Sequence, residues 1–287
     1  MWYNRLSDYL LKKGYVNNEI CPCVFIKKSP SGFVIIDVYV DDLNIIGTRK
    51  EIDDARTHMK EEFKMKDLGK KFFCLGLQIE HFQDGIFVHQ SNYTKRILKR
   101  FNMDKTNPLS TPMVNRSLNV KNDPFRPCED NEDFLGPEVP YMSAIGGLMY
   151  LANCTRPDIA FATNLLARYN SSPTRRHWNG IKHIFRYLQG TIDFGLYYPR
   201  NPEFGLVGFA DAGYLSDLHK FRSQTRYVFT IGGTAISWHS QKQTIVATSS
   251  NYAEIYEDNA ACVAQIKEGY IKSDRTKHIP PRFFSYT

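Results

Sequence analysis

Two short apolar runs with a pair of aspartates between them limit most strongly how this chain of 287 residues can fold. Residues 33–40 are rich in β-branched and aromatic side chains, and residues 43–47 resume that composition after Asp41 and Asp42. Runs of this length and composition are typical of β-strands, and so short a connection joins neighbouring antiparallel strands. The sequence therefore predicts a β-hairpin that carries the two aspartates at its tip.

The residues on either side of this hairpin predict a small unit of helices and strands. Apolar residues recur at helical spacing over residues 2–10, where Gly14 is the expected end of the helix, and again over residues 52–63. Residues 23–27 predict a further strand, and the sequence Ser-Pro-Ser-Gly at 29–32 is typical of a turn. One face of the second helix is expected to be buried, because its apolar positions alternate with charged neighbours.

A second hairpin and a helix are expected next. Residues 72–80 and 85–89 predict two strands, and the sequence Gln-Asp-Gly at 83–85 is a strong turn signal between them. Ser91 is a natural N-cap for a helix whose apolar positions continue to Phe101.

The composition changes between residues 107 and 140, where six prolines and six acidic residues fall together. Proline interrupts helices and strands, so this segment is expected to be a linker or an extended surface loop. Helices and then strands are predicted beyond it. The expected helices lie at 141–151, 157–169 and 174–189, and the expected strands at 206–210, 226–231, 234–239 and 244–248, with a turn at Gly232-Gly233.

The order of these elements predicts an α+β fold with four regions along the chain. The expected regions are residues 1–106, the linker at 107–140, a helical region at 141–205 and a strand-rich region at 206–287. The sequence has no apolar run of membrane-spanning length and no secretion signal at its start. An intracellular protein of the cytoplasm or the nucleus is therefore expected, neither secreted nor bound to a membrane.

Positive charge is in excess and is unevenly distributed along the chain. Lysine and arginine total 37 against 30 aspartate and glutamate, which gives a formal net charge of +7. A uniformly solvated surface would mix the two signs, but here the basic residues gather in short clusters. Clustered positive charge favours nucleic acid as the partner. The clusters lie at residues 64–71, 95–100, 175–186, 219–226 and 272–282.

The adjacent carboxylates of Asp41 and Asp42 have two interpretations. Aspartate is common in solvated turns because its side chain bonds to nearby backbone groups. Two carboxylates in sequence repel, however, and at the end of an apolar strand a nearby cation relieves that repulsion. Mg²⁺ prefers carboxylate oxygens together with substrate phosphates, and a hairpin tip is a rigid place to offer them. We favour metal binding over the solvated turn.

The residues around this hairpin resemble the reverse transcriptases of copia-type long-terminal-repeat retrotransposons. The resemblance begins with Tyr-Val-Asp-Asp at 39–42 and continues, in the order usual for those Pol polyproteins, over essentially the whole chain. The matching segments are KMKDLGKKFFCLGLQIE (64–80), LSTPM (109–113), YMSAIGGLMYLANCTRPDIAF (141–161), HWNGIKHIFRYLQGT (177–191), GFADAGY (208–214), ISWHSQKQ (236–243), ATSSNYAEI (247–255) and EDNAACV (257–263). An ordered set of this size is very specific.

The resemblance implies a fold and a chemistry for each region. It implies a partial reverse-transcriptase palm and thumb, then a helical connection, then an incomplete ribonuclease H-like domain. By resemblance, Asp41 and Asp42 match the polymerase carboxylates, and Asp211, Glu254 and Asp258 match the acidic residues of the nuclease site. Both sites use Mg²⁺ in the family, so all five aspartates and glutamates are candidate catalytic residues and metal ligands.

Basic side chains on two of the expected helices are the candidate contacts to nucleic acid. The expected partner is an RNA–DNA hybrid or a single-stranded nucleic acid. A solvated helix face is the alternative interpretation, and charge alone does not separate the two. The candidates are Lys95, Arg96, Lys99, Arg100, Arg175, Arg176, Lys182 and Arg186.

The chain also departs from the family pattern in ways that affect activity. The fingers and the first palm strand, which carries another metal-binding aspartate, have no counterpart here, so we expect no polymerase activity unless another chain supplies them. Asp37 is weighed as a substitute ligand against a drifted core position, and the second is favoured. In the nuclease region Glu254 and Asp258 are unusually close in sequence, and Arg226 stands where the family usually has glycine. Little or no ribonuclease H activity is expected.

Two further hypotheses remain open from the sequence. The chain is either a non-catalytic nucleic-acid-binding remnant or the product of a genomic relic that scarcely folds. Binding that weakens steeply with salt supports the first, and a non-cooperative melt supports the second.

Overall fold

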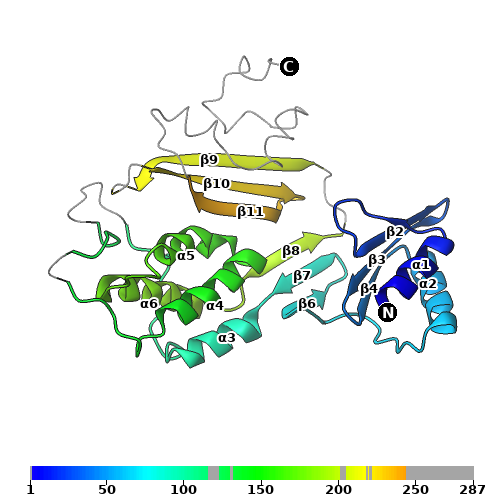
Figure 1. Ribbon diagram of the computed structural model, residues 1–287, viewed down its shortest axis with the longest axis horizontal. Helices are drawn as coiled ribbons and strands as arrows, with labels where there is room; N and C mark the ends of the chain where they lie inside the picture. The colour runs from blue at the N-terminus through cyan, green and yellow to red at the C-terminus, as the bar shows by residue number, and fades with distance from the viewer. Residues whose placement is uncertain are drawn as a thin grey trace, which may run out of the picture. The chain divides into compact units, whose positions relative to one another are not determined.

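The structure is a computed structural model that describes residues 2–115, 123–129, 132–200, 205–217, 219 and 222–243 (Figure 1). The chain divides into two compact units, residues 1–71 and 72–287. Helices and antiparallel sheets occur in the chain, so the predicted α+β class is confirmed. Within the described residues, none of the helices is both long and apolar enough to cross a lipid bilayer.

The first unit is a four-stranded antiparallel sheet with two helices. Its strands pair in the order β1-β2-β3-β4, and both helices lie on the same face of the sheet (Figure 1). The elements are α1 (Trp2–Lys12), β1 (Val16–Asn17), β2 (Val24–Ser29), β3 (Gly32–Tyr39), β4 (Asp42–Gly47) and α2 (Arg49–Glu62).

Strand alternation places the apolar core of this unit under the helices. Val34, Ile36 and Val38 of β3 are buried, whereas the residues between them face the other side of the sheet. The end of α1 is fixed by Gly14, whose φ of 82° lies in the left-handed region that favours glycine. The backbone N–H of Tyr15 donates to the Leu10 carbonyl at 3.1 Å, which completes the expected helix end.

The second unit begins with a second sheet and continues into a helical core. The sheet order is β5-β6-β7-β8, so β8 pairs with a strand that lies more than one hundred residues earlier in the chain. The elements are β5 (Phe73–Cys74), β6 (Leu77–His81), β7 (Gly85–His89), α3 (Ser91–Arg100), α4 (Tyr141–Cys154), the 3₁₀ helix η2 (Pro157–Ile159), α5 (Ala160–Ala167), α6 (Arg175–Gln189) and β8 (Gly195–Pro199).

The prediction of one continuous strand over residues 72–80 is wrong. The chain turns at Leu75 and Gly76, whose φ angles of 50° and 83° are both left-handed, and Cys74 pairs with Leu77 across that turn. A two-residue turn of this kind closes a tight antiparallel hairpin. The turn expected at residues 83–85 is present, because Phe82 donates its backbone N–H to the Gly85 carbonyl at 2.9 Å.

A three-stranded antiparallel sheet follows, in the order β11-β10-β9. It comprises β9 (Leu206–Asp217), β10 (Arg222–Ile231) and β11 (Thr234–Lys242). Gly232 and Gly233 form the predicted turn, with φ angles of 57° and 78°. The strand predicted at 244–248 lies outside the described residues.

Candidate active-site hairpin and nucleic-acid interface

The hairpin between β3 and β4 closes with a two-residue turn. Tyr39 pairs with Asp42, so Val40 and Asp41 form the turn and Asp42 begins β4. The predicted tip, Asp41-Asp42, is therefore displaced by one residue. Val40 has a φ of 53°, which is unusual for a β-branched residue and costs about 1–2 kcal/mol.

The strained turn is held in place and presents its side chains to solvent. The indole N–H of Trp2 donates to the Val40 carbonyl at 3.3 Å, which ties the start of α1 to the turn. The side chains of Tyr39 and Val40 are 52% and 71% exposed, and both aspartates are exposed. Backbone strain of this kind persists where the surrounding structure over-determines it, and it is often associated with functional sites.

Asp37 is not a core residue, so the interpretation favoured from the sequence is wrong. It lies on the face of the sheet opposite the buried Val38, and it pairs across the strands with Asn44. The Asn44 side-chain amide donates to the Asp37 carboxylate at 3.1 Å, and the Lys71 ammonium donates to the Asn44 side-chain oxygen. The cross-strand register places Asp42 on the same face, roughly 7–8 Å away between Cα atoms.

The carboxylates at the turn fit a partial magnesium site. Asp41 and Asp42 are adjacent and open to solvent, and Mg²⁺ is commonly held by one or two carboxylates with water and substrate phosphates completing its coordination. Among the residues that the structure describes, no group of three or more His, Cys, Asp and Glu side chains is arranged to hold a metal ion. The hairpin therefore offers two carboxylates rather than a closed site.

The candidate nuclease aspartate, Asp211, is engaged with a cation from its own protein. It lies on β9 directly opposite Arg226 on β10, and the guanidinium donates to its carboxylate at 2.5 Å. Arg226 also lies over the ring of Phe161, with 5.4 Å between the guanidinium carbon and the ring centroid. Glu254 and Asp258 lie outside the described residues.

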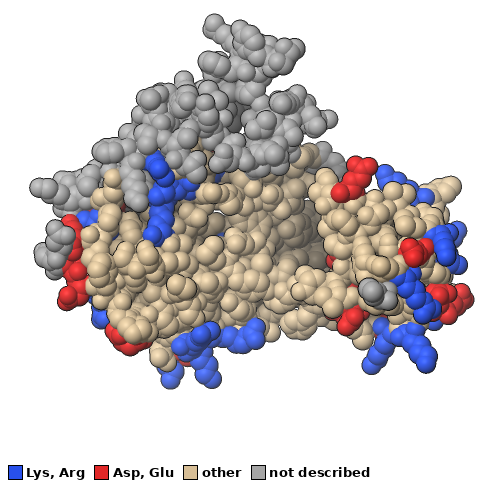
Figure 2. Space-filling model, in the orientation of Figure 1, with Lys and Arg blue, Asp and Glu red and all other residues tan. Residues whose placement is uncertain are grey.

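Helix α3 carries four of the candidate nucleic-acid contacts on an exposed face. Lys95, Arg96, Lys99 and Arg100 are all exposed, whereas Ile97, on the side of the helix that faces α4, is buried in the helical core. No carboxylate in the described part of the chain forms an ion pair with any of the four. Figure 2 shows the blue side chains gathered where α3 runs, below an uncharged surface over α4.

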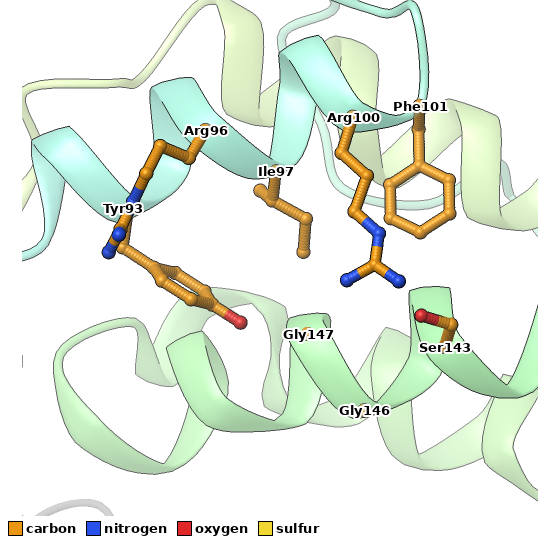
Figure 3. Close-up of a pocket in the computed structure, with 8 residues that line it drawn as sticks. All are labelled: Tyr93, Arg96, Ile97, Arg100, Phe101, Ser143, Gly146 and Gly147. Carbon is orange, nitrogen blue, oxygen red and sulfur yellow. The ribbon is translucent and has the colours of Figure 1, made fainter.

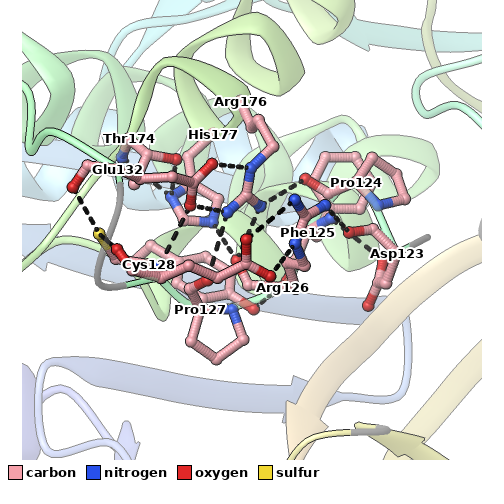
Figure 4. A network of polar contacts seen from close by, with 12 residues as sticks. Asp123, Pro124, Phe125, Arg126, Pro127, Cys128, Glu132, Thr174, Arg176 and His177 are labelled. Atoms are coloured by element: carbon pink, nitrogen blue, oxygen red, sulfur yellow. Dashed lines mark hydrogen bonds and ion pairs between the residues drawn. The ribbon is translucent and has the colours of Figure 1, made fainter. Parts of the chain in front are cut away.

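Helix α6 uses its candidate cations differently. Arg176 binds both carboxylate oxygens of Glu132 and donates to the Arg126 carbonyl at 3.1 Å, and this pairing lowers the pKa of Glu132 to about 2 (Figure 4). Arg186 donates to the Asn107 carbonyl at 2.8 Å. Arg175 is exposed and Lys182 is half-buried.

The described residues of the proline-rich segment thus pack on α6. His177 bonds to the Arg126 carbonyl at 2.9 Å, and Phe125 is buried in the helical core (Figure 4). We call residues 123–129 and 132–135 the strap. The basic cluster at 175–186 therefore combines side chains that bind the strap with side chains that face solvent.

A pocket between α3 and α4 was not predicted from the sequence. It has a volume of about 480 Å³, and Figure 3 shows α3 side chains above and Ser143, Gly146 and Gly147 of α4 below. Its sequence signal is the pairing of a basic helix with a helix that has no charged residue and two adjacent glycines.

Comparisons with known proteins relate the chain to reverse transcriptases and to the Pol polyproteins of transposons. A family model for reverse transcriptase (RNA-dependent DNA polymerase) matches residues 1–115. The chain is 37% identical over 257 residues to the retrovirus-related Pol polyprotein from transposon TNT 1-94 of Nicotiana tabacum, covering 88% of this chain and 19% of that protein. It is 32% identical over 257 residues to the Pol polyprotein from transposon RE2 of Arabidopsis thaliana, covering 88% of this chain and 17% of that protein. No solved structure matches.

A shorter relative matches over most of its own length. An uncharacterized mitochondrial protein of Arabidopsis thaliana is 32% identical over 221 residues, which cover 76% of this chain and 87% of that protein. The chain spans about a fifth of the length of the two Pol polyproteins. The Tyr-Val-Asp-Asp turn at the end of β3 lies within the segment that the family model matches. The chain belongs to the reverse transcriptase (RNA-dependent DNA polymerase) family, among the Pol polyproteins of copia-type retrotransposons.

Proposed function

We propose that this chain carries the catalytic hairpin and a nucleic-acid-binding helix of an RNA-directed DNA polymerase. The observation that supports this most strongly is the strained turn at Val40, which holds two adjacent exposed carboxylates at the end of a buried strand. Asp41 and Asp42 are the residues that would hold Mg²⁺, and helix α3 would hold the backbone of the primer and template. Bound Mg²⁺ would neutralise charge on the phosphates during nucleotide addition.

The hairpin offers only two carboxylates, and this bears on activity. A two-metal polymerase site needs ligands that approach the ions from more than one side. Asp37 is on the same face as Asp42, but its carboxylate already accepts a hydrogen bond from Asn44. We therefore propose that the chain binds nucleic acid alone and extends a primer only when another polypeptide completes the site.

Binding of Mn²⁺, a paramagnetic substitute for Mg²⁺, tests the role of the hairpin without requiring turnover. Electron spin resonance of the purified chain with a primer–template duplex is expected to detect more bound Mn²⁺ than the duplex holds alone. Asp41→Asn/Asp42→Asn should abolish this excess. Asp53→Asn/Asp54→Asn on the exposed surface of α2 is the matched control, because it removes two adjacent carboxylates without touching the hairpin. Equal Mn²⁺ binding by all three proteins would refute the assignment.

Primer extension tests the requirement for a second polypeptide. With Mg²⁺, an RNA template and all four deoxynucleotides, the chain alone is expected to give no product. Magnesium-dependent product that Asp42→Asn removes would contradict the incomplete site while supporting the polymerase hairpin.

We also propose a ribonuclease H ancestry for the sheet β9–β11, without cleavage activity. Arg226 supplies the positive charge beside Asp211 that a metal ion would otherwise supply. Incubation with an RNA–DNA hybrid and Mg²⁺ is expected to leave the RNA intact. Cleavage that is lost in Asp211→Asn would overturn this proposal.

Binding without catalysis is the second candidate function. The cations of α3 favour it, because no described carboxylate forms an ion pair with them. Affinity for nucleic acid is then expected to fall steeply with salt, because each neutralised phosphate releases counterions. The two candidates differ at the hairpin, since only the polymerase proposal predicts the loss of Mn²⁺ in the aspartate variants.

A further inference from the structure

The pocket between α3 and α4 has the properties of a site for one nucleotide. Two cations stand at its two ends: Arg96 lies beside Tyr93, and the guanidinium of Arg100 points toward Ser143 of α4 (Figure 3). Between them Ile97 forms an apolar floor over Gly147. The pocket thus alternates positive, apolar and positive along the helix, which matches the order phosphate, nucleoside, phosphate along a strand.

The spacing of the two arginines suits successive phosphates. Arg96 and Arg100 are one helical turn apart, which corresponds to a rise of about 6 Å and places both side chains on the same face. Each guanidinium is packed against an aromatic ring, Arg96 at 5.7 Å from the centroid of Tyr93 and Arg100 at 5.7 Å from that of Phe101. These contacts orient the cations and leave their N–H groups available to an anion, since no carboxylate in the described residues binds them.

The opposite wall of the pocket is bare and uncharged. Helix α4 has no charged residue, and a Cβ atom added at Gly146 would have no atom within 4 Å. Gly147 is close to α3, because a Cβ atom there would lie 2.1 Å from Cδ1 of Ile97. One glycine therefore allows the two helices to approach, and the other leaves the pocket open. A sugar or base can lie against this wall without desolvating a charge.

We propose that this pocket binds one nucleotide of an unpaired nucleic-acid strand, with its flanking phosphates on Arg96 and Arg100. An unpaired strand fits better than a duplex. A concave site of about 480 Å³ with an apolar floor admits a nucleoside that has left its stack, whereas a duplex keeps its bases turned inward. The proposal rests on the proposed nucleic-acid binding by α3, and it adds the form of the partner and the place where it binds.

Four variants of the full chain test the proposal, with a fluorescent single-stranded oligothymidylate as the probe. Arg96→Ala/Arg100→Ala should weaken binding roughly 100-fold, because two charge-assisted contacts to phosphate are lost. Lys95→Ala/Lys99→Ala is the matched control, because it removes the same charge, at the same spacing, from the same helix. It should weaken binding only about 5-fold, since these lysines do not line the pocket. Both changes should lower the salt dependence of binding by a similar amount.

The glycine at the open wall separates the pocket from simple charge attraction. Gly146→Leu should fill the pocket and weaken binding of the oligonucleotide roughly 10-fold or more, because the leucine side chain occupies the space that the nucleoside needs. The melting temperature of Gly146→Leu should not fall, since a Cβ atom at this position has no atom within 4 Å and leucine has a higher helix propensity than glycine. Gly146→Ala should bind nearly as well as the unchanged protein.

Two results would overturn the proposal. One is equal weakening by the arginine and the lysine pairs, together with unchanged binding in Gly146→Leu, which would leave only diffuse attraction to α3. The other is tighter binding of a blunt duplex than of the single strand. The assay contains no template strand, no free deoxynucleotide and no metal ion, so a failure of the polymerase proposal at the hairpin does not alter its outcome.

Discussion

Helices α3 and α6 are both rich in lysine and arginine, but the side chains of these residues have different partners. The four cations of α3 are exposed, and none forms an ion pair within the described residues. On α6, Arg176 is bound by Glu132 and by backbone carbonyls of the strap, and Arg186 is bound by the Asn107 carbonyl. A cluster of positive charge therefore indicates a nucleic-acid surface only where no segment of the same chain supplies its partners.

Among the described residues, Arg156, between α4 and η2, is the most completely buried lysine or arginine. Its side chain is 2% exposed, donates to the Thr191 carbonyl at 2.8 Å and forms a forked contact with Asp158. The rings of Tyr187 and Phe194 lie on the guanidinium, at 5.6 and 5.5 Å from their centroids. Like Arg176, Arg156 is therefore a cation bound by groups of its own chain, and it lies in the core.

Replacing Arg156 should give the largest effect on stability. Arg156→Met is expected to lower the free energy of unfolding by about 3–5 kcal/mol, because it removes a buried guanidinium that donates to the Thr191 carbonyl, the Thr191 hydroxyl and the Asp158 carboxylate. Arg156→Lys should recover little, since an ammonium does not reproduce the planar fork. Urea unfolding measures both. A loss below about 1 kcal/mol would contradict the view that this cation is structural.

The second-largest effect on stability should come from acid, which weakens the contact between the strap and α6. The Nε2–H of His177 donates to the Arg126 carbonyl, and Nδ1 accepts the backbone N–H of Thr174 at 3.0 Å, so the network requires the neutral ring. Burial lowers the pKa of His177 to about 4 from an ordinary value of 6.5. The unfolded chain therefore takes up this proton first, and stability should fall as the pH drops from 6.5 to 4.

The size of this pH effect follows from the difference in pKa between the folded and the unfolded chain. The expected loss for His177 is on the order of 2–3 kcal/mol. The pKa of Glu132, lowered by Arg176 to about 2 from 4.5, predicts a further loss as the pH falls from 4.5 to 2. Urea unfolding at a series of pH values measures both. His177→Gln should flatten the first part of the profile, and an unchanged slope there would exclude His177 as its source.

Replacing Arg176 should have an intermediate effect on stability, whereas replacing the neighbouring Arg175 should have almost none. Arg176→Met is expected to lower the free energy of unfolding by about 2 kcal/mol, because Glu132 and the strap carbonyls lose their common donor. Arg175→Met is the matched control. It removes an exposed arginine one position away and should change stability by less than about 0.5 kcal/mol. Equal effects in urea unfolding would remove the distinction between the two side chains.

The sequence predicted the features that short-range rules determine. Gly14 ends α1, and Gly232 and Gly233 form the turn between β10 and β11. Each depends on residues close in the chain, where the backbone preference of glycine acts directly. The turn at Leu75 and Gly76 carried the same kind of signal, and it was missed because the apolar residues around it suggested one strand.

Long-range partners explain most of what the sequence did not predict. Nothing near Arg176 in the sequence indicates that Glu132, more than forty residues earlier, binds it, or that no described carboxylate binds Arg96. The pairing of β8 with β7 and the pocket between α3 and α4 likewise depend on tertiary packing. At the candidate site, the sequence located Asp41 and Asp42 to within one residue of the turn, but it misjudged Asp37 because strand alternation alone does not say which face is buried.

The smallest effect on stability should come from replacing cations of α3. This result tests the contrast between α3 and α6 most directly. Lys95→Ala/Lys99→Ala is expected to change the free energy of unfolding by less than about 0.5 kcal/mol, because both side chains are exposed and neither has an ionic partner in the described residues. The same variant should lower affinity for nucleic acid and reduce the salt dependence of binding. If its stability instead fell as far as that of Arg176→Met, the cations of α3 would also be serving the fold, and the contrast with α6 would fail.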